Sequence, residues 1–296
     1  MDPMRRGYVP SAGGQIHYTD IGSGEVVLLI HQVSRSAGIY ARLSRLLAAK
    51  YRVIALDMPG FGNSDPLTKR PFEVADLVQS TVDLLDGLGI DTVRVSGHHT
   101  GATVAGELAA SHPERVVACA PSGYAYTTPQ ERRGTINLEA LAGRHKTPVI
   151  SELASDGSHY QRLLQRALSL LWQSKVSLGT TGILMLPFEN LPQADLDFIN
   201  DFIVDGLRAY ASGAATLEAV ARYDPDSNLP RIRAPTLVIQ STGMLEPPLL
   251  QRAEMVARII AGARTASIPH GDIHMIHTRA DDLCRVLLEF FEGSGV

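Results

Sequence analysis

One stretch of the chain combines residues that could do acid–base chemistry with the spacing of a catalytic turn. It reads Gly97-His98-His99-Thr100-Gly101, after an apolar run and before a run of small residues. This order predicts a buried strand, a sharp turn between glycines and a helix, the arrangement of a G-x-S-x-G nucleophile elbow. Here His99 stands where that pattern has serine. An imidazole titrates near about pH 6.5, so His99 could accept or donate a proton at neutral pH.

A second group of histidines lies near the end of the chain. His270, His274 and His277 fall within nine residues that follow an apolar run. Another histidine, His31, directly follows the apolar run 26–30. These histidines can share a site with His99 only if the fold brings the ends of their strands to one edge.

The chain around these residues alternates buried-strand runs with helical patterns. Residues 14 to 30 read as a hairpin whose second arm is 26–30. Continuous apolar runs predict strands that are covered on both faces. Such alternation predicts an α/β fold, a doubly wound and mostly parallel sheet whose ligands bind beyond the carboxyl ends of the strands. The further strands are expected at 51–57, 92–96, 115–120, 235–240 and 264–269, and the helices at 39–49, 72–88, 101–111, 247–261 and 280–292.

The alternation stops in the middle of the chain. Residues 124–223 have helical patterns without a buried-strand run, which predicts an inserted helical cap over a core domain formed by 1–123 and 224–296. Two apolar helix faces are expected in the cap, and its large aromatic residues are interpreted first as core. The first face comprises Leu163, Leu164, Ala167, Leu168, Leu171 and Trp172, and the aromatic residues are Trp172, Tyr160, Tyr210 and Phe188.

Composition narrows the classes of function. The chain has 296 residues and a net charge of −4, which gives no reason to expect nucleic acid or an anionic membrane as a partner. Cys119 and Cys284 are expected to be buried, and no metal-ligand spacing or cofactor motif is found. Without an apolar leader or a long apolar run, a cytoplasmic location is expected. The expected partner is a small-molecule substrate, and a homo-oligomer is possible.

Four features together resemble the α/β-hydrolase fold superfamily, in its capped branch, from about residue 14 to 292. His31-Gln32 resembles the opening of the oxyanion loop, and Asp57-Met58-Pro59-Gly60-Phe61-Gly62-Asn63-Ser64 resembles the D-x-P-G-x-G-x-S loop. Gly97 to Gly101 matches the elbow, and Pro235-Thr236-Leu237-Val238-Ile239 resembles the strand before the acid loop. The resemblance implies an enzyme with a site at the elbow and a cap above it.

The resemblance also implies roles for residues, although the catalytic positions depart from its pattern. The backbone N–H groups of Val33 and Thr100 are the expected oxyanion hole. His274 matches the late histidine by spacing, with His277 and His270 as alternatives. The expected acid position holds Met244, and Glu246, two residues later, is a possible substitute. Within this resemblance His98 is interpreted mainly as structural, with a supporting role open, and His31 as structural.

A serine mechanism therefore does not carry over, and three classes of function remain. The favoured one is hydrolysis of an ester, a lactone or a similar small apolar carbonyl compound through His99 and His274. His99 is favoured as a general base, and a nucleophilic role through a transient acyl-imidazole is the alternative. The second is a non-hydrolytic lyase, decarboxylase or cyclase of a biosynthetic pathway. The third is an inactive binding protein that keeps the pocket.

Overall fold

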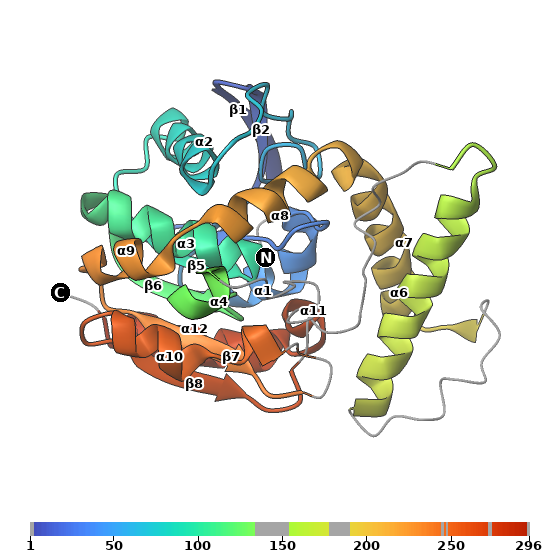
Figure 1. Cartoon of the computed structure of the whole chain (residues 1–296). Helices are drawn as coiled ribbons and strands as arrows, with labels where there is room; N and C mark the ends of the chain where they lie inside the picture. The colour runs from blue at the N-terminus through green and yellow to red at the C-terminus, as the bar shows by residue number, and fades with distance from the viewer. Residues whose placement is uncertain are drawn as a thin grey trace.

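The fold is built on one eight-stranded sheet, shown by a computed structural model (Figure 1). The structure describes residues 3–133, 154–177, 190–243, 246, 248–271 and 274–294. The strand order is β1-β2-β4-β3-β5-β6-β7-β8. The strands are β1 (Arg5–Ser11), β2 (Gly14–Ile21), β3 (Val26–Ile30), β4 (Arg52–Leu56), β5 (Val93–His98), β6 (Val116–Ser122), β7 (Leu237–Ser241) and β8 (Arg264–Ile268). From β4 to β8 neighbouring strands are parallel, as the alternation predicts.

The predicted hairpin is wrong in its pairing. Strand β2 pairs antiparallel with β1 on one side and with β4 on the other, so it is not the neighbour of β3. Tyr18, for example, lies opposite Gly7 and Leu56. The segment Gly22-Ser23-Gly24 therefore redirects the chain within the sheet instead of closing a two-stranded turn, and β3 lies between β4 and β5.

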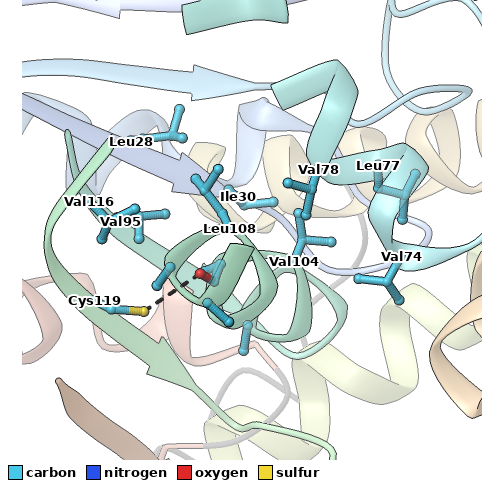
Figure 2. Packing of buried hydrophobic residues seen from close by; sticks show 14 of the residues in the cluster. Leu28, Ile30, Val74, Leu77, Val78, Val95, Val104, Leu108, Val116 and Cys119 are labelled. Carbon is cyan, nitrogen blue, oxygen red and sulfur yellow. Dashed lines mark hydrogen bonds between the residues drawn. The ribbon is translucent and has the colours of Figure 1, made fainter. Parts of the chain in front are cut away.

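Helices cover both faces of the sheet, which explains the continuous apolar runs. Alternate residues of a strand point to opposite faces. In β3, Leu28 and Ile30 belong to the cluster that includes α2 (Val74–Gly87) and α3 (Thr100–Ser111), as Figure 2 shows. Val27 and Leu29 pack on the other face with α1 (Ala41–Leu47) and α12 (Ala280–Glu292). The strand ends that carry the histidines are thereby held in a rigid central layer.

The described part of the region between β6 and β7 consists of helices joined by loops, and no named strand lies in it. It contains α4 (Pro129–Arg133), α6 (Ser158–Ser177), α7 (Gln193–Arg208) and α8 (Gly213–Arg222), followed by the short α9 (Pro225–Asn228). Figure 1 shows α6 and α7 side by side at one end of the molecule, while α8 contacts both α2 and α3. Ala167 and Leu171 of α6 pack on Phe198 and Ile199 of α7.

The expected core role of the insertion's aromatic residues is wrong for those that the structure describes. Tyr160, Trp172 and Tyr210 are all exposed, Trp172 to 45%. The side of α6 that packs on α7 runs through Ala167 and Leu171, whereas Leu168 and Trp172 face outward. Phe188 lies outside the described residues.

Two simpler expectations concern the cysteines and the membrane. Cys119 and Cys284 are both buried and free, as predicted. Within the described residues, no helix has the length and apolar character needed to span a bilayer.

Candidate active site

The elbow predicted around His99 is present in the backbone. His99 lies between β5 and α3 with φ 49° and ψ −109°, a left-handed conformation that costs a residue with a Cβ about 1–3 kcal/mol. Two glycines make the turn sterically possible. A Cβ on Gly97 would lie 2.0 Å from the Gly101 carbonyl oxygen, and a Cβ on Gly101 would lie 2.1 Å from that of Ile30. Strain of this kind persists only where the surrounding structure enforces it, and it marks His99 as a functional candidate.

Glu246 is the direct partner of His99. The His99 Nε2 atom lies 3.0 Å from Glu246 Oε1, within hydrogen-bond distance. The side chain of His99 is 12% exposed and that of Glu246 is fully buried. Gly123, directly after β6, leaves the space for this contact, since a Cβ there would lie 2.5 Å from His99 Cδ2 and 3.0 Å from Glu246 Oε1. The pair thus extends from the end of β5 across β6 to the loop after β7.

Burial sets the protonation of this pair. Desolvation lowers the pKa of His99 to about 3. Desolvation also raises the pKa of Glu246 to about 8, against a smaller lowering by the positive charge of His98. Both groups are therefore neutral at pH 7, and the pair holds two protons without net charge. In this form either partner can donate the hydrogen bond, the Glu246 carboxyl through O–H or the His99 imidazole through Nε2–H.

The ring of His98 lies flat against the ring of His99. Their centroids are 3.8 Å apart and the rings are inclined by 25°. His98 is fully buried, and its Nδ1 atom lies 2.9 Å from Ser122 Oγ. The Ser122 hydroxyl donates to the Gly97 carbonyl oxygen at 3.1 Å, so Nδ1 of His98 carries the proton that Ser122 accepts. His98 therefore belongs to the same cluster as His99, and its Nδ1–H is held by Ser122.

His274 lies at the junction between the sheet and the helical insertion. It is buried with its ring edge-on to Phe198 of α7, at 5.2 Å between centroids. His277 also contacts Phe198, at 5.0 Å, whereas His270 is exposed. Burial and nearby positive charge, first from Arg35 and then from Arg166, hold the pKa of His274 well below its usual value. His274 is therefore neutral at pH 7, like His99.

Arg35 connects the turn after β3 to α7. It is buried, its guanidinium lies 5.3 Å from the centre of the Phe202 ring, and its Nη1 lies 3.7 Å from Asp205 Oδ2. Desolvation raises the pKa of Asp205 to about 6, while the charge of Arg35 opposes that rise. This charged contact ties the insertion to the strand-end loop in front of the site.

The two expected oxyanion donors lie on elements that pack directly against each other. Val33 is part of a turn closed by the Arg35 N–H, which donates to the Gln32 carbonyl oxygen at 3.2 Å. Thr100 is the first residue of α3, where backbone N–H groups have no acceptor inside the helix. Gly101 lets this helix end approach Ile30 and His31 at the end of β3. The helix dipole makes the same end suitable for a developing negative charge.

His31 and Asp57 hold the loops in front of the site. His31 Nε2 accepts the Met58 N–H at 2.9 Å and its Nδ1–H donates to the Gln32 carbonyl oxygen at 2.7 Å. The Asp57 carboxylate accepts from Ala37 N–H at 2.6 Å and meets His17 Nδ1 at 2.7 Å. These contacts give His31 a role in loop support, in line with its interpretation from the sequence.

The structure gathers part of the predicted set around the elbow. His98, His99 and Glu246 lie together, whereas the contacts described for His274 and His277 lie on the Phe198 side. Met244 lies outside the described residues. Sequence reasoning missed Ser122, Gly123 and Arg35. Their positions in the loops that follow predicted strands, at the edge where ligands bind, were the signal that could have identified them. Among the described residues no group of histidine, cysteine and carboxylate side chains could hold a metal ion.

Known proteins with similar sequences are hydrolases. The chain is 26% identical to 2-hydroxy-6-oxononadienedioate/2-hydroxy-6-oxononatrienedioate hydrolase 2 of Pseudomonas putida, over 94% of this chain and 92% of that protein. It is 27% identical to the corresponding hydrolase of Paraburkholderia xenovorans, over 86% of this chain and 81% of that protein.

Solved structures with the same fold carry the comparison further. The enol-lactonase of Burkholderia xenovorans matches with a TM-score of 0.71 and 21% identity, over 97% of this chain and all of that chain (100%). A meta-cleavage product hydrolase of Pseudomonas fluorescens matches with a TM-score of 0.73 and 20% identity, over 98% of both chains. At this level of identity the two structures support the fold alone.

A family model settles the assignment that the elbow, the sheet order and the inserted helices suggest. The model described as the alpha/beta hydrolase fold matches residues 25–248, which include the elbow, the helical insertion and Glu246. The chain is a member of the alpha/beta hydrolase fold family.

Proposed function

We propose that this protein hydrolyses a small carbonyl compound, such as an ester or a lactone, by acid–base catalysis through His99 and Glu246. The observation that carries the proposal is the 3.0 Å contact between His99 Nε2 and Glu246 Oε1 at a strained elbow. Strained backbone and perturbed pKa values concentrate at functional sites, and both meet at His99.

The contact with Glu246 assigns different tasks to the two ring nitrogens of His99. Nε2 faces Glu246, which leaves Nδ1 for a reactant. When Nε2–H donates to the Glu246 carboxyl group, Nδ1 carries a lone pair and acts as a base. When the Glu246 O–H donates to Nε2 instead, Nδ1 carries the proton and acts as a donor. One neutral pair can therefore take up a proton and return it.

In the proposed reaction water adds to the substrate carbonyl carbon as its proton passes to His99 Nδ1. The N–H groups of Val33 and Thr100 bind the resulting oxyanion. Collapse of the tetrahedral intermediate breaks the bond to the leaving group, which takes the proton back from His99. A carboxylic acid and an alcohol, or their enol equivalents, are the products. His274 is proposed to assist from the Phe198 side, with His277 as the neighbouring support.

The relatives support a carbonyl substrate of this size. They are named for hydrolysis of 2-hydroxy-6-oxo acids, and a protein of the same fold is named an enol-lactonase. We propose that residues 124–223 form the cap that selects the substrate above a core of 1–123 and 224–296. The buried Arg35 and the nearby Arg166 create positive potential around His274, which suits a substrate with an acidic group.

The test is hydrolysis of p-nitrophenyl esters, enol lactones and 2-hydroxy-6-oxo-dienoates by the wild type and by His99→Ala. General acid–base catalysis contributes about 10²–10⁴ in rate, so His99→Ala should lower kcat/KM by that factor. His112→Ala is the matched control, since His112 lies beyond the far end of α3. Equal activity of wild type and His99→Ala would refute the role of His99.

The neutral pair also favours a second candidate, a lyase that takes a proton from carbon. A neutral carboxyl–imidazole pair can accept that proton and return it to the product without forming an acyl intermediate. Substrate loss without incorporation of ¹⁸O from labelled water would identify this reaction, whereas hydrolysis places ¹⁸O in the acid product.

A further inference from the structure

The rings of His98 and His99 share one side of the chain although they are consecutive residues. Neighbouring side chains of an extended strand point to opposite faces. Here the strand ends at His98, and the left-handed backbone of His99 turns its side chain back. The result is the stacked contact at 3.8 Å. The strained elbow therefore places the ring of His99 against the ring of His98.

Ser122 fixes both histidines to the neighbouring strand. Its hydroxyl oxygen accepts from His98 Nδ1 at 2.9 Å, and its carbonyl oxygen accepts the His99 N–H at 2.9 Å. Because the Ser122 hydroxyl donates to Gly97, the orientation of the His98 ring is set by a chain of hydrogen bonds within β5 and β6. His98 is thus a rigid, fully buried surface for the ring of its neighbour.

The His99 ring is confined by two further contacts. Gly123 lies so close to Cδ2 and Nε2 that a methyl group there would collide with both atoms, and Glu246 meets Nε2. Rotation of the His99 ring about its χ angles would break the Glu246 contact. The flat face of His98 blocks this rotation.

We propose that His98 is a positioning residue that holds the His99 imidazole in the plane where Nε2 meets Glu246 and Nδ1 faces the reactant. The inference rests on the proposed acid–base role of His99. His98 is also electrostatically linked to both ends of the site, because a positive charge on it lowers the pKa of Glu246 and of His274.

Two substitutions distinguish the effect of the flat His98 ring from the effect of its hydrogen bond to Ser122. His98→Phe keeps a flat ring beside His99 and loses the Ser122 contact, whereas His98→Leu fills similar space without a flat ring. The readout is the ¹⁵N shifts of the His99 imidazole in labelled protein, which report the tautomer and need no turnover. The signals are assigned by their loss in His99→Gln, and thermal unfolding of each variant verifies that it folds.

The wild type and His98→Phe should show the same His99 ring ¹⁵N shifts, and His98→Leu should show shifts displaced by loss of the Glu246 contact. Misplacement of a catalytic group costs about a hundredfold in rate. We therefore expect kcat to fall by about tenfold to a hundredfold in His98→Leu, with KM little changed, and much less in His98→Phe. Wild-type shifts in folded His98→Leu would overturn the proposal. Displaced shifts in His98→Leu, combined with full activity of His99→Ala, would uphold the positioning and refute the proposed function alone.

Discussion

His99 Nε2 and Glu246 Oε1 meet at 3.0 Å although 147 residues separate them in the sequence. The elbow supplies the largely buried imidazole and the loop after β7 supplies the carboxyl group. Their burial moves the two pKa values apart, to about 3 for His99 and about 8 for Glu246. This separation makes the pair neutral over a broad range of pH and determines how its chemistry should respond to pH.

The rate should rise with pH in a way that depends on Glu246. Above about pH 8 the Glu246 carboxyl group ionises, accepts the His99 Nε2–H and makes Nδ1 a stronger base. Glu246→Gln cannot ionise, so its pH–rate profile should be flat through this region and its rate at pH 9 lower by about 10-fold or more. The measurement is kcat/KM between pH 6 and 10. The exposed Glu218 provides the control variant Glu218→Gln, which should retain the wild-type profile.

Stability should respond to the same carboxyl group with the opposite sign. The pKa of Glu246 is raised by folding from 4.5 to about 8, so its contribution is fully favourable below pH 4.5 and is lost as pH rises to about 8. Glu246→Gln avoids this loss. Urea unfolding should show the variant gaining about 2–4 kcal/mol relative to the wild type between pH 5 and pH 9. A constant difference across that range would show that Glu246 ionises normally in the folded protein.

The local sequence pattern was enough to predict the helices and strands but not which strands pair with each other. The helix expected at 280–292 is present with the same bounds, and the elbow lies where the glycines and His99 place it. These features depend on neighbours in sequence. The predicted pairing of β2 with β3 was wrong, since β2 pairs with β4. Long-range packing decides between these two neighbours, and the turn residues near Gly22 do not encode it.

The candidate site shows the same division between local and long-range information. His99 and its strained turn could be predicted from the spacing of Gly97 and Gly101. The contact of Glu246 could only be left open, because it depends on where the loop after β7 lies and on the space above Gly123. The exposed position of Trp172 on α6 could not be predicted from the sequence either. An apolar stripe along a helix does not indicate how much of the stripe another helix covers.

The buried contact between Arg35 and Asp205 should make the attachment of α7 depend on pH. In Arg35→Met the carboxylate of Asp205 loses its nearby cation, and its pKa, already about 6, should rise further. Loss of one partner of a buried ion pair costs about 3–5 kcal/mol. Because Asp205 is ionised in the wild type only above pH 6, this cost should be small at pH 5 and large at pH 8.

The double variant Arg35→Met, Asp205→Asn removes both charges and serves as the control. Its unfolding free energy should exceed that of Arg35→Met at pH 8 and match it at pH 5. Urea unfolding at the two pH values measures both effects. If Arg35→Met loses the same stability at both pH values, the loss comes from its contact with Phe202 rather than from Asp205.

Substitution of Gly123 distinguishes an effect on the candidate site from an effect on the stability of the fold. Gly123→Ala introduces a Cβ 2.5 Å from His99 Cδ2, at a backbone position with φ 57°. The imidazole must move, so kcat should fall by about 10²-fold, the usual effect of a displacement near 1 Å. Gly89→Ala carries the same backbone strain, with φ 63°, but a Cβ there meets nothing within 4 Å.

Both variants should lose about 1–2 kcal/mol of stability through the left-handed backbone. Only Gly123→Ala should lose activity and the His99–Glu246 contact, measured by kcat and by the His99 ring ¹⁵N shifts. Equal activity of the two variants would mean that the ring of His99 is free to move without consequence for the reaction.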